Sequence, residues 1–239
     1  LLLHHIGMAT SPGLYRNLPY KTLDDFEYLG MVIDVPMTLI GRPNLPAASY
    51  AELVKWLEAN RGKINLANAG LGAASHLCGL LLQQSLKINM TTVPYKGTAP
   101  AMNDLLGGQV DILCDQTTNT SGQIAAGAVR AYAVTTLKPL TTPALAKLPT
   151  LDSQGLKGFK VSIWHGLYAP RGTPKAVLDT INSALRAALK DPEFIKRQEA
   201  LGAVVITDNR VNPGEHKKFV EAEINKWGPV IKAAGQYAD

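Results

Sequence analysis

The sequence lacks the features of a nucleic-acid-binding or membrane-spanning protein. Aromatic residues make up only 6% of its 239 residues, and its 24 Lys and Arg residues are scattered rather than clustered. Both observations argue against a nucleic-acid partner. No apolar run approaches the roughly 18 to 20 residues that a membrane-spanning helix requires. Hydrophobic residues make up 46% and charged residues 18%, which excludes a disordered chain and allows a sizeable core. The net charge of +5 suits an anionic ligand, and equally a merely solubilising surface.

Only two cysteines are present, Cys78 in a helix-like apolar stretch and Cys114 in a strand-like one. Neither belongs to a C-x-x-C pair, and no zinc-type spacing occurs. Two alternatives stay open from the sequence: a pair of buried free thiols, or a single disulfide formed in an oxidising compartment.

Sequence motifs of catalysis are also missing. There is no G-x-S-x-G nucleophile elbow and no Walker loop, and the glycine-rich segment near residue 70 is not a dinucleotide fingerprint because residue 75 is Ser. The spacings of His4, His5, His76 and His165 match no metal-ligand motif. A triad of residues distant in sequence stays open, but we expect no enzyme activity, no metal and no cofactor.

The chain opens with three leucines followed at once by two histidines, without the basic leader or cleavage site of a signal peptide. Such an opening resembles a buried strand that has been cut near its start. We therefore expect that the natural chain begins further upstream.

Strand-like and helix-like segments alternate through almost the whole sequence. Expected strands cover residues 1–5, 26–33, 37–40, 63–67, 90–93, 110–114, 129–134, 161–169 and 204–206. Expected helices begin near Ser49, His76, Thr98, Ser121, Thr173, Asp191 and Asn212, most of them at capping residues or first-turn prolines, and residues 11–13 are expected to form a turn. This alternation predicts an α/β fold with parallel strands and helices on both faces. Ligands of such folds bind beyond the carboxyl ends of strands, where helix N-termini point.

The strongest local signal is residues 64–76, a strand followed by a loop of glycines and alanines and then a helix. Small residues let a ligand approach the backbone closely. The first N–H groups of the helix have no partner inside the helix and lie at the positive end of its dipole. The segment therefore predicts an anion site, to which Ser75 adds a hydroxyl and His76 a ring N–H. An ordinary tight turn between strand and helix is the alternative.

Two further places offer polar groups. The run Asp115 to Thr120, which includes Thr117, follows an apolar strand, so it predicts either ligand contacts or a capping turn. Trp164 and His165 lie in another expected strand and should face opposite sides of its sheet. For Trp164 the core is the more common location.

Longer runs carry a family resemblance. The most specific are V-P-Y-K-G-T-A-P-A at 93–101 and D-L-L-G-G-Q-V-D at 104–111, and further matches are L-Y-R-N-L-P-Y at 14–20, N-A-G-L-G-A-A-S-H-L at 68–77, A-Y-A-V-T-T at 131–136 and G-L-Y-A-P-R-G-T-P at 166–174. They resemble the Bug or TctC family, the extracytoplasmic solute receptors of tripartite tricarboxylate transporters. The resemblance runs over essentially the whole chain.

The resemblance implies a type II periplasmic binding protein of the Venus-flytrap kind, with two α/β domains and a hinge. Domain 1 would hold residues 1–36 and 162–239, and domain 2 would hold residues 37–161. The crossings near Pro36 and Val161 would form the hinge. Family members grip one ligand carboxylate between two strand-to-helix loops. Residues 68–76 match one of these loops, whereas the other, a proline–glycine loop near the family's N-terminus, is absent from this sequence.

The same resemblance implies which residues contact the ligand. The matched loop would contribute Gly70, Leu71, Gly72, Ala73, Ala74, Ser75 and His76, mainly through main-chain N–H groups. The family's preceding loop matches residues 4–9, where His4, His5, Ile6 and Met8 replace small polar residues and favour a bulkier, partly apolar or aromatic acid. Trp164 and His165 would lie near the mouth of the cleft, where Trp164 could stack on the ligand, and Asp115 and Thr117 complete the predicted contacts.

The function implied is that of a monomeric periplasmic receptor without enzyme activity. It would capture a small di- or tricarboxylate, or an aromatic acid, and deliver it to the membrane components of a tripartite transporter. A periplasmic sensor that reports its ligand to a signalling system is the alternative. An enzyme on a similar scaffold is a weaker one, because fold does not fix function.

Overall fold

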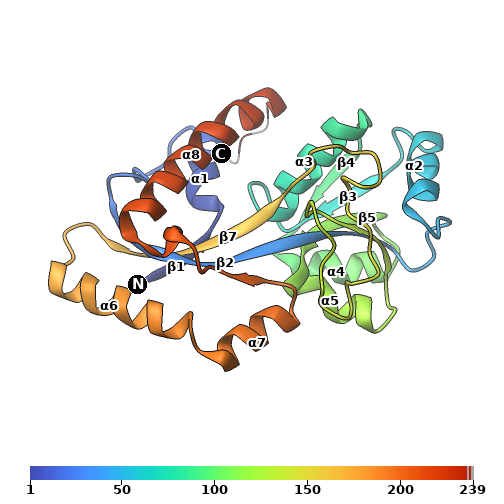
Figure 1. The fold of residues 1–239 in the computed structure, drawn as a ribbon. Helices are drawn as coiled ribbons and strands as arrows, with labels where there is room; N and C mark the ends of the chain where they lie inside the picture. Colours follow the sequence, from blue (N-terminus) through green and yellow to red (C-terminus); the bar gives the residue numbers. More distant parts are fainter. Residues whose placement is uncertain (236, 238–239) are drawn as a thin grey trace. The chain divides into compact units, whose positions relative to one another are not determined.

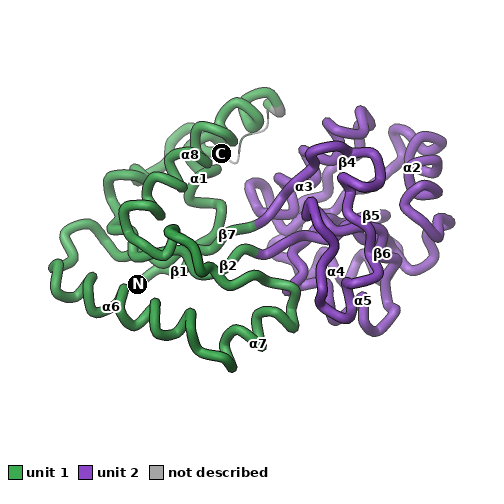
Figure 2. Tube along the Cα trace, in the orientation of Figure 1, with its two compact units in different colours: residues 1–34, 163–239 green, residues 35–162 purple. Residues whose placement is uncertain are grey.

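The computed structural model describes residues 1–235 and 237, and the chain forms two compact units (Figure 2). Unit 1 contains residues 1–34 and 163–239, and unit 2 contains residues 35–162. The chain passes between the units twice, from Asp34 to Val35 and from Ser162 to Ile163. The hinge expected near these crossings stays a prediction.

Unit 1 contains β1 (Leu2–His5), α1 (Gly7–Leu14), the first part of β2 (Phe26–Gly41), β7 (Ser162–Pro170), α6 (Lys175–Ala188), α7 (Pro192–Ala200), β8 (Val204–Val205), the 3₁₀ helix η1 (Asn209–Val211) and α8 (Pro213–Ala234) (Figure 1). Strand β1 pairs antiparallel with β7, and β8 pairs antiparallel with β2. Helices cover both faces of these strands. Trp164 of β7 packs on Phe219 of α8, whereas Leu167 joins the apolar cluster of Leu185 on α6.

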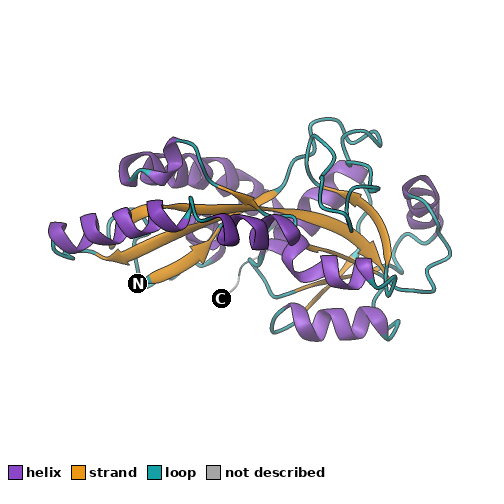
Figure 3. Ribbon diagram, turned by 60° about the horizontal axis from the view of Figure 1, so that its bottom comes forward, coloured by secondary structure: helices purple, strands orange, loops and turns teal. Residues whose placement is uncertain are grey.

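Unit 2 contains the second part of β2, α2 (Tyr50–Ala59), β3 (Asn65–Asn68), α3 (Ala74–Leu86), β4 (Thr91–Pro94), α4 (Thr98–Leu106), β5 (Ile112–Gln116), α5 (Thr117–Ala125) and β6 (Arg130–Val134) (Figure 1). Figure 3 distinguishes the helices from the strands by colour. Strand β3 pairs parallel with both β4 and β5. Strand β2 pairs antiparallel with β5 and β6. The predicted parallel pairing is thus confirmed for β3, β4 and β5, while the remaining pairs are antiparallel.

The core of unit 2 follows from the alternation of side chains along its strands. Ala67 and Leu113 point to the face covered by α4, where they pack in a cluster with Leu105. Leu66 lies on the other face, against Gly79 of α3. Both faces of the central strands are therefore buried, as the apolar runs in the sequence indicate.

A disulfide joins Cys78 of α3 to Cys114 of β5, with 6.0 Å between the two Cα atoms. Of the two alternatives that the sequence left open, the structure therefore shows the disulfide and not the pair of free thiols. Both cysteines are fully buried. The bond fixes α3 about one turn from its N-terminus against the sheet.

Three expected elements differ from the structure. The helix expected to begin near Ser121 begins at Thr117, as α5. The turn expected at residues 11–13 lies inside α1, whose Gly13 packs against Ile231 of α8. Tertiary packing therefore overrides the turn preference of Ser-Pro-Gly. The two strands expected at 26–33 and 37–40 form one strand. Pro36 cannot donate a hydrogen bond, but its fixed φ suits an extended chain, so the strand continues through it.

The expected helix caps are partly confirmed. Ser49 accepts a hydrogen bond from Glu52 N (3.2 Å), and Asp191 accepts one from Phe194 N (2.7 Å). Thr98 does not cap its helix, because its hydroxyl donates to Asp115 instead. Asn212 provides no side-chain cap to α8. Among the described residues, no helix combines the length and apolar character of a membrane span.

Candidate functional site

Three helices of unit 2 begin at one edge of its parallel strands. Strands β3, β4 and β5 run in the same direction, and each leads within a few residues into α3, α4 or α5. The carboxyl ends of the strands and the N-termini of the helices consequently share this edge. Ligands of open α/β sheets bind at such an edge, so it is the candidate site of unit 2.

The loop between β3 and α3 is held by its own hydrogen bonds. Ala69 N–H donates to Ser75 Oγ (2.8 Å), Gly70 N–H to Asn68 Oδ1 (2.9 Å) and Gly72 N–H to His76 Nδ1 (3.1 Å). Ala73 N–H donates to the Gly70 carbonyl (3.1 Å). The predicted ligand contacts at Gly70, Gly72 and Ala73 are therefore N–H groups that already have acceptors within the loop.

Glycine is required at two loop positions. Gly70 has φ +124° and Gly72 has φ +77°, in the region that residues with a side chain rarely adopt. A Cβ at residue 70 would also lie 3.1 Å from the carbonyl oxygen of Tyr95. The glycines thus let the loop pass close to the neighbouring segment and turn into α3.

The N-terminus of α3 keeps the donors that the sequence predicted. Leu77 N–H makes the first bond of the helix, to the Ala73 carbonyl (3.1 Å), so the N–H groups of Ala74 and Ser75 have no acceptor inside the helix. No other group in the described part of the chain accepts from them. The first turn contains no acidic residue that would neutralise the positive end of the helix dipole. Ala74 and Ser75 therefore offer two adjacent donors to an anion.

Three buried polar atoms at the same strand ends have no hydrogen-bond partner among the described residues: Asn68 Nδ2, Gln116 Oε1 and Thr117 Oγ1. The orientation of the Asn68 amide is set by Gly70 N–H, which donates to its oxygen. An unsatisfied buried polar group typically costs about 1–3 kcal/mol. A ligand or ordered water at this edge would satisfy these groups.

Thr117 was predicted individually as a contact, whereas Gln116 was included only in the polar run 115–120 and Asn68 only in the loop 68–76. Asn68 alternates to the same face of β3 as Leu66, and Gln116 to the same face of β5 as Cys114, which is the α3 face. Both residues are the last of their strands. Their polar character at a strand end was a signal that could have found them.

Asp115 has a different environment. Its carboxylate accepts hydrogen bonds from the Thr98 hydroxyl (2.7 Å), Gln116 N–H (2.6 Å) and Asn119 Nδ2 (3.2 Å). Burial raises the pKa of this carboxyl group, while these three hydrogen bonds lower it. Its contacts tie β5 to the first turns of α4 and α5, so Asp115 organises the edge, and a direct ligand contact stays a prediction.

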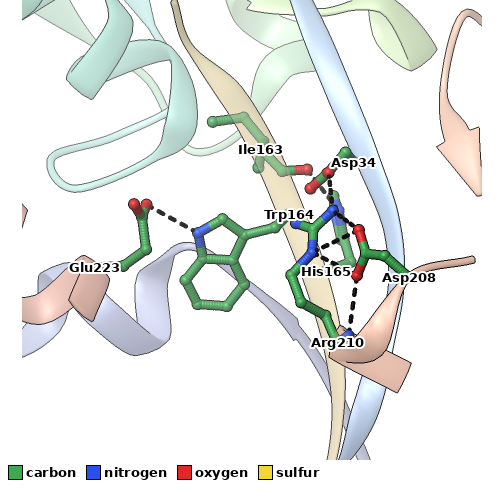
Figure 4. A network of polar contacts seen from close by, with 7 residues as sticks. All are labelled: Asp34, Ile163, Trp164, His165, Asp208, Arg210 and Glu223. Carbon is green, nitrogen blue, oxygen red and sulfur yellow. Dashed lines mark hydrogen bonds and ion pairs between the residues drawn. The ribbon is translucent and has the colours of Figure 1, made fainter. Parts of the chain in front are cut away.

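The four residues predicted in unit 1 fall into two groups. Met8 is 1% exposed and Trp164 is 2% exposed, so both are core side chains in this structure. The Trp164 indole N–H donates to Glu223 Oε2 (3.1 Å) (Figure 4). Its predicted stacking on a ligand stays a prediction.

His5 and His165 are half-buried and face each other across the β1–β7 pair, with ring centroids 5.9 Å apart. Gly7 N–H donates to Nδ1 of His5 (3.0 Å), which leaves the ring hydrogen on Nε2. Burial, together with His4 and His165, lowers the pKa of His5 to about 4. Burial also lowers the pKa of His165. Both imidazoles are neutral at pH 7. His5 can donate one hydrogen bond from Nε2 without carrying charge, whereas His165 already donates its ring N–H from Nδ1 to the Ile163 carbonyl (3.2 Å), so its Nε2 is an acceptor.

Comparison of this chain with known proteins identifies its family. The tripartite tricarboxylate transporter family receptor, TctC, matches residues 1–236. The solved periplasmic binding protein BugD is 51% identical to this chain with a TM-score of 0.91, over 98% of this chain and 78% of BugD. MatC from Rhodopseudomonas palustris, solved with bound malate, is 33% identical with a TM-score of 0.87, over 96% of this chain and 78% of MatC.

A third structure, R. palustris Rpa4515 with adipate, is 30% identical with a TM-score of 0.89, over 98% of this chain and 77% of that protein. These similarities confirm the periplasmic-binding-protein fold that the sequence predicted. The chain belongs to the TctC family of tripartite tricarboxylate transporter receptors.

Proposed function

We propose that this protein is a periplasmic receptor that binds a small dicarboxylate at the edge of unit 2 and supplies it to a tripartite transporter. The observation that carries the proposal is the coincidence of two free helix-terminal N–H groups, Ala74 and Ser75, with partnerless polar atoms at the neighbouring strand ends. A carboxylate has about four lone-pair directions, so it can accept from several of these donors at once.

Each group has a distinct part in this proposal. The N–H groups of Ala74 and Ser75, the amide nitrogen of Asn68 and the hydroxyl of Thr117 donate to carboxylate oxygens. Gln116 Oε1 is an acceptor and cannot bind a carboxylate oxygen. It suits a donor on the ligand, such as a hydroxyl group beside the carboxylate.

The family neighbours support this ligand class. MatC was solved with malate and Rpa4515 with adipate, and both ligands are dicarboxylates. The buried disulfide supports an oxidising compartment, which the periplasm is. In unit 1, the neutral imidazole of His5 is proposed as a further donor that discriminates among acids, and Nε2 of His165 as an acceptor for a ligand hydroxyl.

The first test is calorimetric titration of the chain with malate, succinate, adipate, citrate and benzoate. We expect a dicarboxylate to bind, and malate to bind more tightly than succinate, because the two differ by the hydroxyl that Gln116 would accept from. In Gln116→Leu that difference should disappear. Binding of benzoate alone would instead support the aromatic-acid alternative, and chromatography of the incubated mixture checks that the acid is not converted.

The second test removes a single donor. Ala74 is the first residue of α3, and proline is well accepted there because the missing N–H has no helical partner. Ala73 before it has φ −64° and ψ 159°, the extended conformation that a following proline requires. We expect Ala74→Pro to weaken dicarboxylate binding about tenfold or more, as loss of a charge-assisted hydrogen bond does.

Ala74→Ser is the matched control, because it changes the same buried side chain and keeps the N–H. It should bind like the wild type. Equal affinity of Ala74→Pro and wild type in a folded protein would remove the α3 N-terminus from the site.

A further inference from the structure

The two chain crossings between the units have a shared anchor in unit 2. β2 enters unit 2 at Val35, and β7 leaves it at Ser162. Thr135, which directly follows β6, is fully buried beside both segments. Its hydroxyl accepts a hydrogen bond from Met37 N–H (2.9 Å) and donates one to the Val161 carbonyl (2.6 Å).

The backbone of Thr135 also forms hydrogen bonds with Met37 and Val161. Thr135 N–H donates to the Met37 carbonyl (2.9 Å), and Val161 N–H donates to the Thr135 carbonyl (3.1 Å). One residue therefore bonds to both segments through main chain and side chain alike. A valine has the same shape but would leave Met37 N–H and the Val161 carbonyl without this partner.

Unit 1 anchors its own ends of the same two strands (Figure 4). Arg210 donates through Nη2 to Asp34 (3.0 Å) and to Asp208 (2.7 Å), so the last unit-1 residue of β2 is held by an ion-pair network. Next to the other crossing, the Trp164 indole is fixed by Glu223, which also accepts from Trp227 Nε1 (3.0 Å).

On each strand, two residues lie between the residue bonded within unit 1 and the residue bonded to Thr135. These are Val35 and Pro36 on β2, and Ser162 and Ile163 on β7. The pairing of β2 with β8 ends at Asp34, and its pairing with β5 begins at Met37. Pro36 has no N–H to donate. β2 and β7 also pair with each other in the sheet, so the two crossings bend together, and we infer that the backbone rotations that turn one unit against the other fall at these residues.

We propose that Thr135 is a positioning residue for ligand binding, whose hydroxyl clamps both crossing strands and confines the hinge to residues 35–36 and 162–163. The proposal rests on the receptor function above. A ligand that binds one arrangement of the units gains affinity when that arrangement is well populated beforehand. Releasing the clamp lets the units sample more arrangements and lowers that population.

The test compares Thr135→Val with Thr135→Ser, which keeps the hydroxyl, and with Thr150→Val. Thr150 is another buried threonine of unit 2, which pairs with Val134 but whose hydroxyl accepts from Ser153 N–H (3.0 Å) and not from either crossing strand. Exposed Lys55 of unit 2 and Lys196 of unit 1 are changed to cysteine in each of these proteins and spin-labelled. The distance distribution between the labels is measured without ligand, and malate affinity is then measured by calorimetry.

We expect Thr135→Val to broaden the distance distribution and to weaken malate binding on the order of fivefold or more. Thr135→Ser and Thr150→Val should match the wild type in both. A Thr135→Val distribution as narrow as that of the wild type would overturn the proposal. Because this readout needs no ligand, it is separate from a failure of the receptor function, which would appear as wild-type protein that binds no dicarboxylate.

Hydrogen exchange on the unmodified chain provides a measurement that requires no variant. The N–H groups of Met37 and Val161, which are held by Thr135, should exchange slowly. Exchange of Met37 N–H as fast as that of exposed loop residues would contradict the clamp.

Discussion

Removal of the Cys78–Cys114 disulfide should destabilise the protein by an amount that the sequence separation sets. The bond spans 36 residues, and both cysteines are fully buried. In the chain-entropy treatment, closing a loop of this length restricts the unfolded chain by about 4 kcal/mol at 25 °C. Changing both residues to alanine, C78A/C114A, should therefore lower the free energy of unfolding by about 4 kcal/mol. For a protein of this size, that corresponds to a decrease in Tm of about 8–16 °C.

The assay is urea unfolding of ligand-free protein followed by circular dichroism, with the melting temperature as a second readout. Wild-type protein with and without reductant is the control, because a buried disulfide should resist reduction in the native state. A loss of stability below about 1 kcal/mol in the double variant would refute the reasoning, since it would mean that the bond barely restricts the unfolded chain. The variant should also bind dicarboxylates more weakly, because Cys78 lies about one turn after the Ala74 donor in α3.

Three further predictions concern single residues. Thr117→Val removes a buried hydroxyl that has no partner among the described residues, so it should raise the stability of ligand-free protein by up to about 1–3 kcal/mol while lowering dicarboxylate affinity; a variant less stable than wild type would contradict this. Asp115→Ala leaves the Thr98 hydroxyl and Gln116 N–H without their acceptor, so it should lower the free energy of unfolding by about 2–3 kcal/mol. An unchanged midpoint in urea unfolding would show that these two hydrogen bonds contribute little to stability. His216 is a fully buried residue of α8 that accepts a hydrogen bond from Gly30 N–H (3.2 Å). Burial lowers its pKa to about 3, below its unfolded value of 6.5, so the unfolded chain binds the extra proton between these pH values. The contribution of His216 to stability should therefore fall by about 3 kcal/mol from pH 7 to pH 4, and His216→Gln should show a shallower loss of stability than wild type, in which His5 also contributes.

Local sequence rules succeeded where the determining contacts are local. The caps at Ser49 and Asp191 depend on residues three positions away, and both are confirmed. The donors of Ala74 and Ser75 follow from a loop entering a helix, which a short segment shows by itself. The parallel order of β3, β4 and β5 was expected from the alternation of strands and helices.

Sequence rules failed where distant residues decide. The core location of Trp164 was expected, but its partners Glu223 and Phe219, which lie on α8 more than fifty residues later, could not be found from the sequence. The role of Thr98 depends on Asp115, which becomes its neighbour only when α4 packs on β5. The disulfide depends on the same kind of packing, and so does the recognition of Asn68 and Gln116 as partnerless groups at one sheet edge.

The central claim is that the N-terminus of α3 holds the carboxylate, and a crystal structure of the complex with malate tests it most directly. We predict a carboxylate oxygen within about 3.2 Å of the main-chain nitrogen of Ala74 or Ser75, with a second contact to Asn68 or Thr117. Bound malate elsewhere, with these two N–H groups directed only at water, would contradict the account.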